Sequence, residues 1–232
     1  DAGAKQVVEV QVPESWKNAE DEGLFMSHAS HGAQEAQDFV NNIQCKINAQ
    51  EGNTLPVSAF TEYVDGTTPS GTAAYEKRGI AVNVPVWQPE NCIQCNRCAY
   101  VCPHAVIRPV ALTEDELAKA PEGTKAIDMI GMPGMKFTMT VSAYDCTGCG
   151  SCVNVCPGKK GEKALVMANM EENAAEQDIF DFGREIEVKP EVVAKFKPET
   201  VKGSQFKQPL LEFSGACAGC GETPYAKLIT QL

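Results

Sequence analysis

Two runs of closely spaced cysteines are the residues of this sequence best suited to chemistry. The first run, NCIQCNRCAYVCPH, holds four cysteines at intervals of three, three and four residues. The second run, DCTGCGSCVNVCPG, repeats these intervals, and each of its cysteines lies 54 positions after its counterpart. Clustered thiolates of this kind favour metal binding over disulfides, so two related metal sites are expected. The cysteines are Cys92, Cys95, Cys98 and Cys102, then Cys146, Cys149, Cys152 and Cys156.

The full spacing, C-x2-C-x2-C-x3-C-P, is typical of [4Fe–4S] clusters in two-cluster proteins. Three cysteines on one curled loop converge on three iron corners of one cluster. The proline that follows the fourth cysteine fixes φ and removes a backbone donor, so the fourth thiolate is directed toward the cluster of the other repeat. Gly148 and Gly150 are expected to adopt positive φ and to bring backbone N–H groups to sulfur.

The expected ligand sets are therefore crossed between the two runs. A zinc site, which also uses Cys-x-x-Cys pairs, is the alternative. Zinc gives no reason for a third cysteine three residues later, or for a terminal Cys-Pro in both copies, so clusters are favoured. We expect one cluster on Cys92, Cys95, Cys98 and Cys156, and a second on Cys146, Cys149, Cys152 and Cys102.

A shorter cysteine motif lies in GACAGCGETPYAKL, where Cys217 and Cys220 form one Cys-x-x-Cys pair at the start of a predicted helix. Alone, this pair fits a zinc site or a thiol redox motif equally well. Beside two clusters it is also interpreted as half of a third cluster site, with two ligands beyond Leu232. Cys45 stands alone in the sequence and is expected to be a small buried residue.

Composition limits the classes of protein to consider. The 232 residues, 43% of them hydrophobic, suffice for one large or two ordinary domains. The net charge of −11 argues against nucleic-acid binding, which needs a basic surface. No apolar run reaches membrane-spanning length, and the N-terminal stretch DAGAKQVVEV has no signal-peptide core. We therefore expect a cytoplasmic globular protein without nucleic-acid or membrane partners.

Hydrophobic periodicity predicts the elements that position these cysteines. Alternation predicts strands at 7–12 and 80–87, the second confined to a sheet edge by Pro85. Residues 32–43 show helical spacing of apolar side chains, and Thr113 with Glu116 fits a capping box. We also expect a turn followed by a strand within 125–145, a strand at 163–169 and a helix at 171–186.

The two runs imply a pseudo-symmetric unit, because HAVI after the first run matches KALV after the second. The expected fold class is α+β: a loop-rich, bacterial-type 2[4Fe–4S] ferredoxin-like domain with insertions, flanked by partial domains. The ring of His104, just after the first run, is expected to form a hydrogen bond at the start of a strand. Residues 188–209, rich in proline and lysine, are interpreted as an extended linker.

Four motifs, taken in order, resemble the pyruvate:ferredoxin oxidoreductase family of anaerobic 2-oxoacid oxidoreductases. They are GTAAYEKRGIAVNVPVWQPENCIQCNRCAYVCPHAVIRP, DCTGCGSCVNVCP, KALVM and GACAGCGETPY, which together extend the resemblance over nearly the whole chain. The resemblance implies a fragment of three parts. These are residues 1–35, the tail of a preceding domain; residues 36–192, the ferredoxin-like domain with an insertion at 109–143; and residues 193–232, a linker and the start of a thiamine-diphosphate domain.

The resemblance also implies oxidative decarboxylation of pyruvate with coenzyme A, yielding acetyl-CoA, CO2 and reduced ferredoxin or flavodoxin. Electrons would leave a thiamine-bound intermediate one at a time through three [4Fe–4S] clusters. Cys217 and Cys220 would supply two ligands of the cluster nearest thiamine diphosphate, which Glu222 would contact. A surface carboxylate near a helix N-terminus is the alternative for Glu222. Magnesium and a homodimeric full-length chain are implied as well.

Three other functions remain to be weighed. A free-standing polyferredoxin and the cluster-carrying piece of an unrelated oxidoreductase would both use the same cysteine runs. A zinc-stabilised interaction module would use them without electron transfer. The motif GACAGCGETPY argues against the polyferredoxin, so this chain is expected to be an electron-transfer module that does not decarboxylate by itself.

Overall fold

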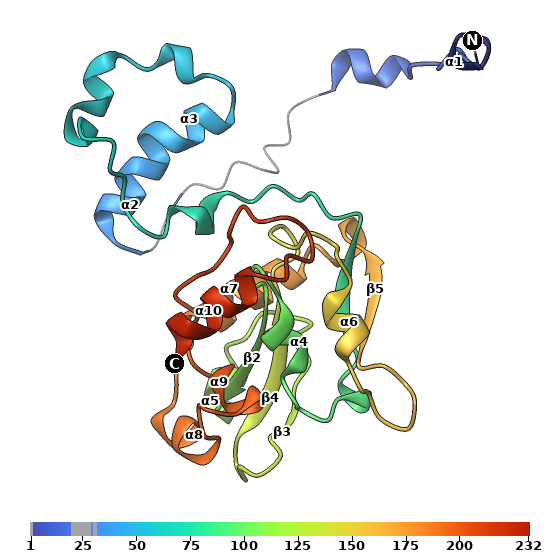
Figure 1. Cartoon of the computed structure of the whole chain (residues 1–232), viewed down its shortest axis with the longest axis vertical. Helices are drawn as coiled ribbons and strands as arrows, with labels where there is room; N and C mark the ends of the chain where they lie inside the picture. The colour runs from blue at the N-terminus through green and yellow to red at the C-terminus, as the bar shows by residue number, and fades with distance from the viewer. Residues whose placement is uncertain (1, 20–28, 30–31) are drawn as a thin grey trace.

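The computed structural model describes residues 2–19, 29 and 32–232, and Figure 1 shows two small sheets with short helices around them. The strands are β1 (Asn83–Trp87), β2 (Ile107–Leu112), β3 (Ile127–Asp128), β4 (Lys136–Val141) and β5 (Leu165–Asn169). The α-helices are α1 (Ala2–Lys5), α2 (Gln34–Phe39), α3 (Cys45–Asn48), α4 (Arg97–Val101), α5 (Glu114–Leu117), α6 (Ser151–Val155), α7 (Glu176–Glu185), α8 (Pro190–Lys195), α9 (Val201–Ser204) and α10 (Thr223–Gln231). A π-helical turn, η2 (Val40–Gln44), and short 3-10 helices complete the order: η1 (Glu14–Asn18), η3 (Gly52–Thr54), η4 (Val57–Tyr63), η5 (Thr72–Tyr75), η6 (Pro89–Asn91) and η7 (Glu171–Asn173).

Each cysteine run lies between two strands that belong to different sheets. β1 precedes the first run and pairs antiparallel with β5, which follows the second run. β4 precedes the second run and pairs antiparallel with β2, which follows the first run. β3 extends that sheet, giving the order β2-β4-β3. Both sheets therefore join the two repeats, and the antiparallel sheets with separate helices agree with the predicted α+β class.

The predicted strands around the cysteine runs are confirmed. Residues 83–87 form β1, residues 136–141 form β4 and residues 165–169 form β5. Pro85 lies opposite Met167 in a two-stranded sheet, where both strands are edges and a missing N–H donor is tolerated. The capping box is confirmed as well, because Glu116 N donates to Thr113 Oγ1 and Thr113 N donates to Glu116 Oε2.

An apolar core holds the larger sheet against α7 and the C-terminal segment. The ring of Phe137 on β4 lies edge-on to those of Trp87 and Phe206, with centroids 5.9 and 6.4 Å away. A Cβ on Gly183 of α7 would lie 3.0 Å from Thr140 Cγ2, so glycine lets this helix approach β4 closely. This core fixes the sheet whose strands lead into and out of the cysteine runs.

The predicted helix near residue 36 is confirmed and is longer than expected, because α2, η2 and α3 follow one another from Gln34 to Asn48. In Figure 1 these helices lie to one side of the body that holds the sheets. Residues 72–82, here called the strap, run from this helical part to β1; Gln44 Nε2 donates to Thr72 O at its start. Cys45 is buried, as predicted.

Two predictions about the elements were wrong. Residues 7–12 form no strand, and Val8 and Val10 are exposed, since no strand of the described part of the chain pairs with them. Residues 188–209 are not an extended linker, because they contain α8 and α9 and pack on the body. Val192 and Phe206 are buried in the main apolar core, which outweighs the proline and lysine content of the segment.

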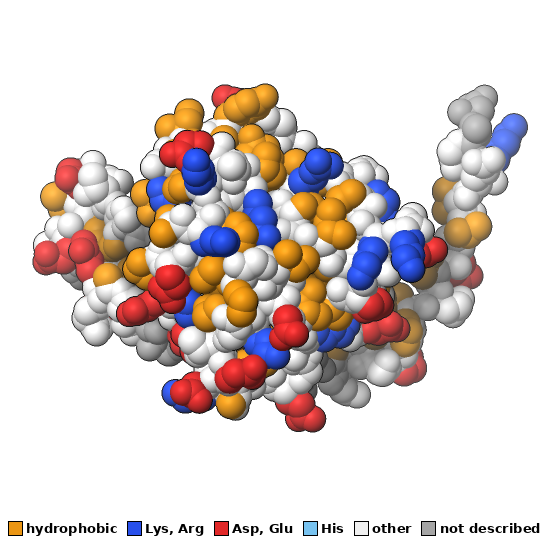
Figure 2. Space-filling view, turned by 90° about the horizontal axis from the view of Figure 1, so that it is seen from below, with side chains coloured by type: hydrophobic (Ala, Val, Ile, Leu, Met, Phe, Trp, Pro, Cys, Tyr) orange, Lys and Arg blue, Asp and Glu red, His pale blue; other side chains and the backbone are white. Residues whose placement is uncertain are grey.

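The surface is mixed in charge on the face that Figure 2 shows, where basic, acidic and hydrophobic side chains alternate over short distances. Within residues 2–19, 29 and 32–232, no helix is both long and apolar enough to cross a membrane.

Candidate metal centre

Four cysteines from both runs surround a first cavity. α4 carries Cys98, the loop before it carries Cys92 and Cys95, and Cys156 arrives at the end of α6. Trp87, Met139 and Leu165 add apolar walls to this cavity. Cys98 Sγ lies 4.0 Å from Met139 Sδ. The four cysteines are those expected together from the spacing: Cys92, Cys95, Cys98 and Cys156.

A second cavity repeats this arrangement with the runs exchanged. The loop before α6 brings Cys146 and Cys149, α6 brings Cys152, and Cys102 arrives from the end of α4. Pro85, Ile107 and Met167 line the same cavity, so apolar side chains again surround the thiols. The structure thus brings together Cys102, Cys146, Cys149 and Cys152, which are the second expected set.

The end of each cysteine-bearing helix explains why the fourth thiol crosses over. Cys102 ends α4 with φ −67° and ψ 117°, and Cys156 ends α6 with φ −66° and ψ 117°. Both residues precede proline, which disfavours the helical region for the residue before it. The chain therefore leaves each helix in extended conformation at this cysteine and carries its thiol to the cavity of the other repeat.

The loops before the two helices adopt left-handed conformations at matching positions. Gly148 and Gly150 have φ of 67° and 73°, as predicted. Gln94 and Asn96 occupy the equivalent positions of the first run with φ of 56° and 58°, although positive φ is unfavourable for residues that carry a side chain. Gly148 N donates to Cys146 Sγ and Gln94 N to Cys92 Sγ, both at 3.4 Å. The expected contact of N–H groups with cluster sulfurs stays a prediction.

Buried side-chain hydrogen bonds hold the two non-glycine residues in place. Gln94 is 1% exposed; its Nε2 donates to Asp128 O at 2.8 Å, and Ile130 N donates to its Oε1 at 2.8 Å. Asn96, also 1% exposed, donates through Nδ2 to Lys202 O at 2.9 Å. Sequence reasoning missed both residues. Superposing the two runs could have found them, because they stand where the second run has glycine.

Burial favours the neutral form of several thiols in the two cavities by raising their pKa. Burial, and then the neighbouring thiols, raise the pKa of Cys98 well above its usual value. Burial raises the pKa of Cys146 to about 11 and that of Cys152 to about 12, and Cys102 adds to both effects. Ionising them in these cavities requires positive charge nearby, which iron supplies when thiolates bind it.

The arrangement of the sulfur atoms bears on the kind of metal centre. Throughout the part of the chain that the structure describes, no three His, Cys, Asp or Glu side chains converge closely enough to hold a single metal ion. Each cavity instead has four thiols in its lining. A [4Fe–4S] cluster separates its thiolates in this way, because each binds a different iron corner. The residues present therefore fit two such clusters.

The third cysteine pair lies at the N-terminal end of α10, outside both cavities. Cys217 is exposed and Cys220 N donates to Cys217 O at 3.0 Å, which closes a turn. Thr223 Oγ1 donates to Cys220 Sγ at 3.1 Å and lowers the pKa of that thiol. A Cβ on Gly219 would lie 3.6 Å from Cys149 Cβ, so this turn touches the rim of the second cavity.

Two further predicted residues lie near this turn. Glu222 is exposed and precedes α10 without forming a side-chain cap. His104 is buried, and its Nδ1 donates to Ser214 O at 2.9 Å, while Phe213 N donates to His104 O at 2.9 Å. The predicted ring hydrogen bond of His104 is confirmed, and it ties the first run to the segment that leads to Cys217.

Two protein-family models match separate parts of the chain. Residues 91–160, which include both cysteine runs, match a 4Fe-4S dicluster domain. Residues 27–81, which include the helical part and most of the strap, match EKR, a domain of unknown function. The first of these matches supports the cluster interpretation over zinc.

Proteins similar over the whole chain give the wider context. Pyruvate:ferredoxin oxidoreductase of Moorella thermoacetica is 52% identical over 100% of this chain, which spans 19% of that protein. Pyruvate-flavodoxin oxidoreductase of Enterobacter agglomerans is 49% identical over 100% of the chain, again 19% of its own length. The chain is therefore similar, over its whole length, to one part of pyruvate:ferredoxin and pyruvate-flavodoxin oxidoreductases. The predicted resemblance to this family is confirmed.

The chain spans about a fifth of the length of these relatives. A further relative, the mitochondrial pyruvate dehydrogenase [NADP(+)] of Euglena gracilis, is 43% identical over 97% of the chain, which is 12% of its length. None of the eleven cysteines, all of which the structure describes, forms a disulfide.

Proposed function

We propose that this chain carries electrons through [4Fe–4S] clusters within a pyruvate:ferredoxin or pyruvate:flavodoxin oxidoreductase. The observation that carries the proposal is the pair of cavities, each surrounded by four thiols drawn from both runs. Cys92, Cys95, Cys98 and Cys156 would hold one cluster, and Cys102, Cys146, Cys149 and Cys152 the other. Each cluster accepts and donates one electron at a time, and the apolar walls exclude water and tune the potential.

We propose that the third pair begins this electron path. Cys217 and Cys220 would be two ligands of a third cluster, and the turn between them touches Cys149 of the second cavity. The second and first cavities adjoin, because α4 and α6, which carry or end at cysteines of both cavities, pack against each other. The supported sequence of sites is therefore the third pair, the second cavity and then the first cavity.

The remaining assignments rest on the family resemblance and on the names of the relatives. They are pyruvate and coenzyme A as substrates, acetyl-CoA and CO2 as products, and ferredoxin or flavodoxin as electron acceptor. Thiamine diphosphate with magnesium, contacted by Glu222, would belong to a domain that begins within residues 193–232. A ferredoxin-like domain at 36–192, a homodimeric full-length chain and a cytoplasmic location complete the proposal.

Metal analysis of the anaerobically purified protein tests the cluster assignment. We expect about eight iron atoms and as many acid-labile sulfides in the two complete sites, and a brown colour. Zinc in place of iron and sulfide would favour the interaction module instead. A polyferredoxin would keep its iron but show no pyruvate-dependent reduction of the clusters when the full-length protein is supplied with coenzyme A and thiamine diphosphate.

A further inference from the structure

Lys227 of α10 lies buried at the end of the helix that bears Cys98. Lys227 is 1% exposed. Its Nζ donates to Ala99 O at 2.5 Å, Tyr100 O at 3.2 Å and Cys102 O at 3.0 Å. Three carbonyl acceptors match the three N–H donors of an ammonium group, which carries a positive charge.

This charge lies at the end of the helix that connects the two cavities. α4 supplies Cys98 to the first cavity and ends at Cys102, which lines the second. Among the residues that the structure describes, no carboxylate forms an ion pair with Lys227. Of the cysteines that line the cavities, Cys102 is the one whose carbonyl accepts a hydrogen bond from Lys227 Nζ. The ammonium is therefore closest in effect to the second cavity.

The second repeat has an equivalent lysine with a different environment. Lys163 Nζ donates to Asn154 O at 3.2 Å and Cys156 O at 2.6 Å, at the end of α6. These carbonyls match those of Tyr100 and Cys102 in the first repeat. Lys163, however, is exposed and lies only seven residues from Cys156, whereas Lys227 is buried and lies 125 residues from Cys102.

A buried cation without a carboxylate partner is costly, because its hydration is lost. A cluster with four thiolates carries a charge of about −2 and gains one further negative charge on one-electron reduction. In a poorly hydrated site a nearby cation stabilises the reduced form more than the oxidised form. Water screens the same interaction at an exposed lysine.

From this arrangement, and resting on the proposed function, we propose that Lys227 is the buried counter-charge of the second-cavity cluster. It is a positioning residue that raises the reduction potential of that cluster above the value set by its four cysteines alone. Because Lys227 belongs to α10, the same contact links the docking of the segment after Cys220 to the ease with which the second cavity accepts an electron.

Three substitutions in the full-length protein separate charge from hydrogen bonding. Lys227→Gln keeps hydrogen-bond donors and loses the charge, Lys227→Arg keeps the charge, and Lys163→Gln is the matched control at the equivalent exposed site. Each protein is purified anaerobically, its iron and sulfide are measured, and its clusters are titrated with a chemical reductant while electron paramagnetic resonance is recorded.

We expect Lys227→Gln to lower the midpoint potential of one cluster by at least 59 mV, which is a tenfold change in its oxidised-to-reduced ratio at fixed potential. Lys227→Arg and Lys163→Gln are expected to change that ratio less than threefold. Loss of clusters in Lys227→Gln but not in Lys227→Arg would also support a required counter-charge. Equal shifts in Lys227→Gln and Lys163→Gln, or no shift with full iron content, would overturn the inference while leaving the cluster assignment intact. Absence of iron from the unsubstituted protein would instead overturn the proposed function.

Discussion

At the scale of single residues, the fourth cysteine of each run decides how the two cavities are completed. Cys102 and Cys156 adopt nearly the same extended conformation before proline, and each lines the cavity of the opposite repeat. Sequence spacing alone led to this expectation, because proline restricts the residue before it whatever the rest of the fold does.

Cys102→Ala is expected to damage the cluster bound by Cys146 and to spare the one bound by Cys92. With three thiolates left, one iron corner is exposed, so conversion to a three-iron cluster is the expected product. Electron paramagnetic resonance of each variant distinguishes the two sites once one is altered. Cys156→Ala should show the reverse pattern. Damage to the same cluster by Cys102→Ala and Cys92→Ala would mean that the fourth ligand is local.

Gln94→Ala is expected to lower the free energy of unfolding by about 2 kcal/mol, because the buried hydrogen bonds to Asp128 and Ile130 are lost. Gln94→Gly is the matched control. It loses the same bonds but relieves the positive φ of 56°, so it should be the less destabilised of the two. Urea unfolding of cluster-loaded protein measures both. If Gln94→Ala proved more stable than Gln94→Gly, the cost assigned to the positive φ at this position would be contradicted.

Other residues of the site were not predictable from the chain alone. Gln94, Asn96 and Lys227 bind backbone groups that lie 34 to 128 positions away in sequence. No local sequence pattern predicts that these side chains bind distant backbone groups, since a polar residue near a cysteine run is usually solvated. The cysteines that line the cavities were predictable, because their spacing along the chain determines which of them can meet.

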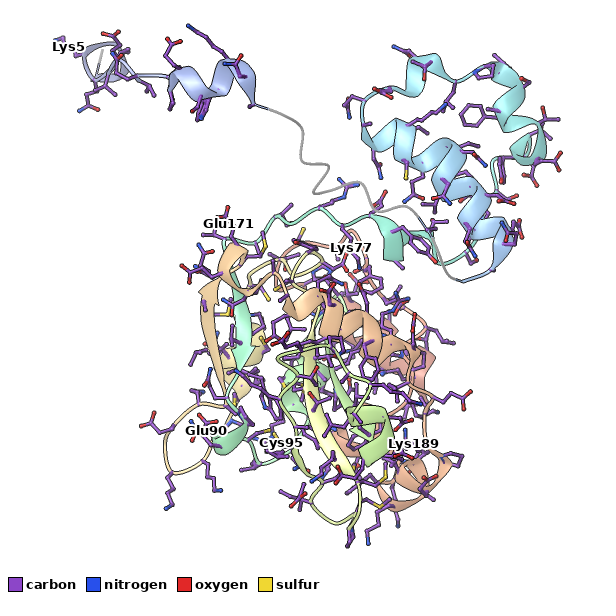
Figure 3. All side chains as sticks on the ribbon, turned by 180° about the vertical axis from the view of Figure 1, so that it is seen from behind. Lys5, Lys77, Glu90, Cys95, Glu171 and Lys189 are labelled. Atoms are coloured by element: carbon purple, nitrogen blue, oxygen red, sulfur yellow. The ribbon has the colours of Figure 1, made fainter. Side chains whose placement is uncertain are left out.

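At the scale of elements, the strap (72–82) contacts and stabilises the loop that begins the second run. Lys77 pairs with Asp145, next to Cys146, and both side chains are buried. Lys77 Nζ also lies 4.7 Å from the ring centroid of Phe213, and Gly79 N donates to Tyr144 O at 2.8 Å. Figure 3 shows Lys77 where the strap meets the body, away from Cys95.

Lys77→Met is expected to cost about 3–5 kcal/mol of stability, because it leaves Asp145 buried without its cation. Arg78→Met, its neighbour in the sequence, removes an exposed pair with Glu76 and should cost about 1 kcal/mol or less. Denaturant unfolding of the two variants gives the comparison. Equal losses would mean that the strap contributes through its backbone alone.

The segment that contains α8 and α9 shows why some elements cannot be predicted from the sequence. These helices have six and four residues, too few for periodicity to be distinctive or for a helix to be stable by itself. Their stability comes from Val192 and Phe206, which reach a core formed by residues far earlier in the chain. The predicted strand at 7–12 failed for the opposite reason, because alternation without a pairing partner does not make a sheet.

At the scale of the whole molecule, the cavities hold together regions of unequal intrinsic stability. α4 and α6 have five residues each and are too short to persist alone, whereas β2 and β4 pair over six positions within the main core. Bound clusters would therefore contribute most to the order of the cysteine loops and least to the sheet.

Removing iron and sulfide by oxidation and chelation should accordingly loosen residues 92–106 and 146–158 while β2, β4 and α7 stay protected. Amide hydrogen exchange, compared between cluster-loaded and cluster-free protein, measures this directly. Exchange that rises uniformly along the chain would show instead that the clusters are required for the entire fold.

The exchange of thiols between repeats has a consequence for biosynthesis. Cys98 leaves the ribosome 58 residues before Cys156, which at roughly 5–20 residues per second is a delay of roughly 3–12 s. Until Cys156 emerges the first cavity lacks its fourth thiol, and until Cys146 emerges the second has only the thiol of Cys102. If the proposed ligand sets hold, neither cavity has its four thiols until the chain has emerged as far as Cys152, so iron and sulfur delivery would follow synthesis of most of the second run.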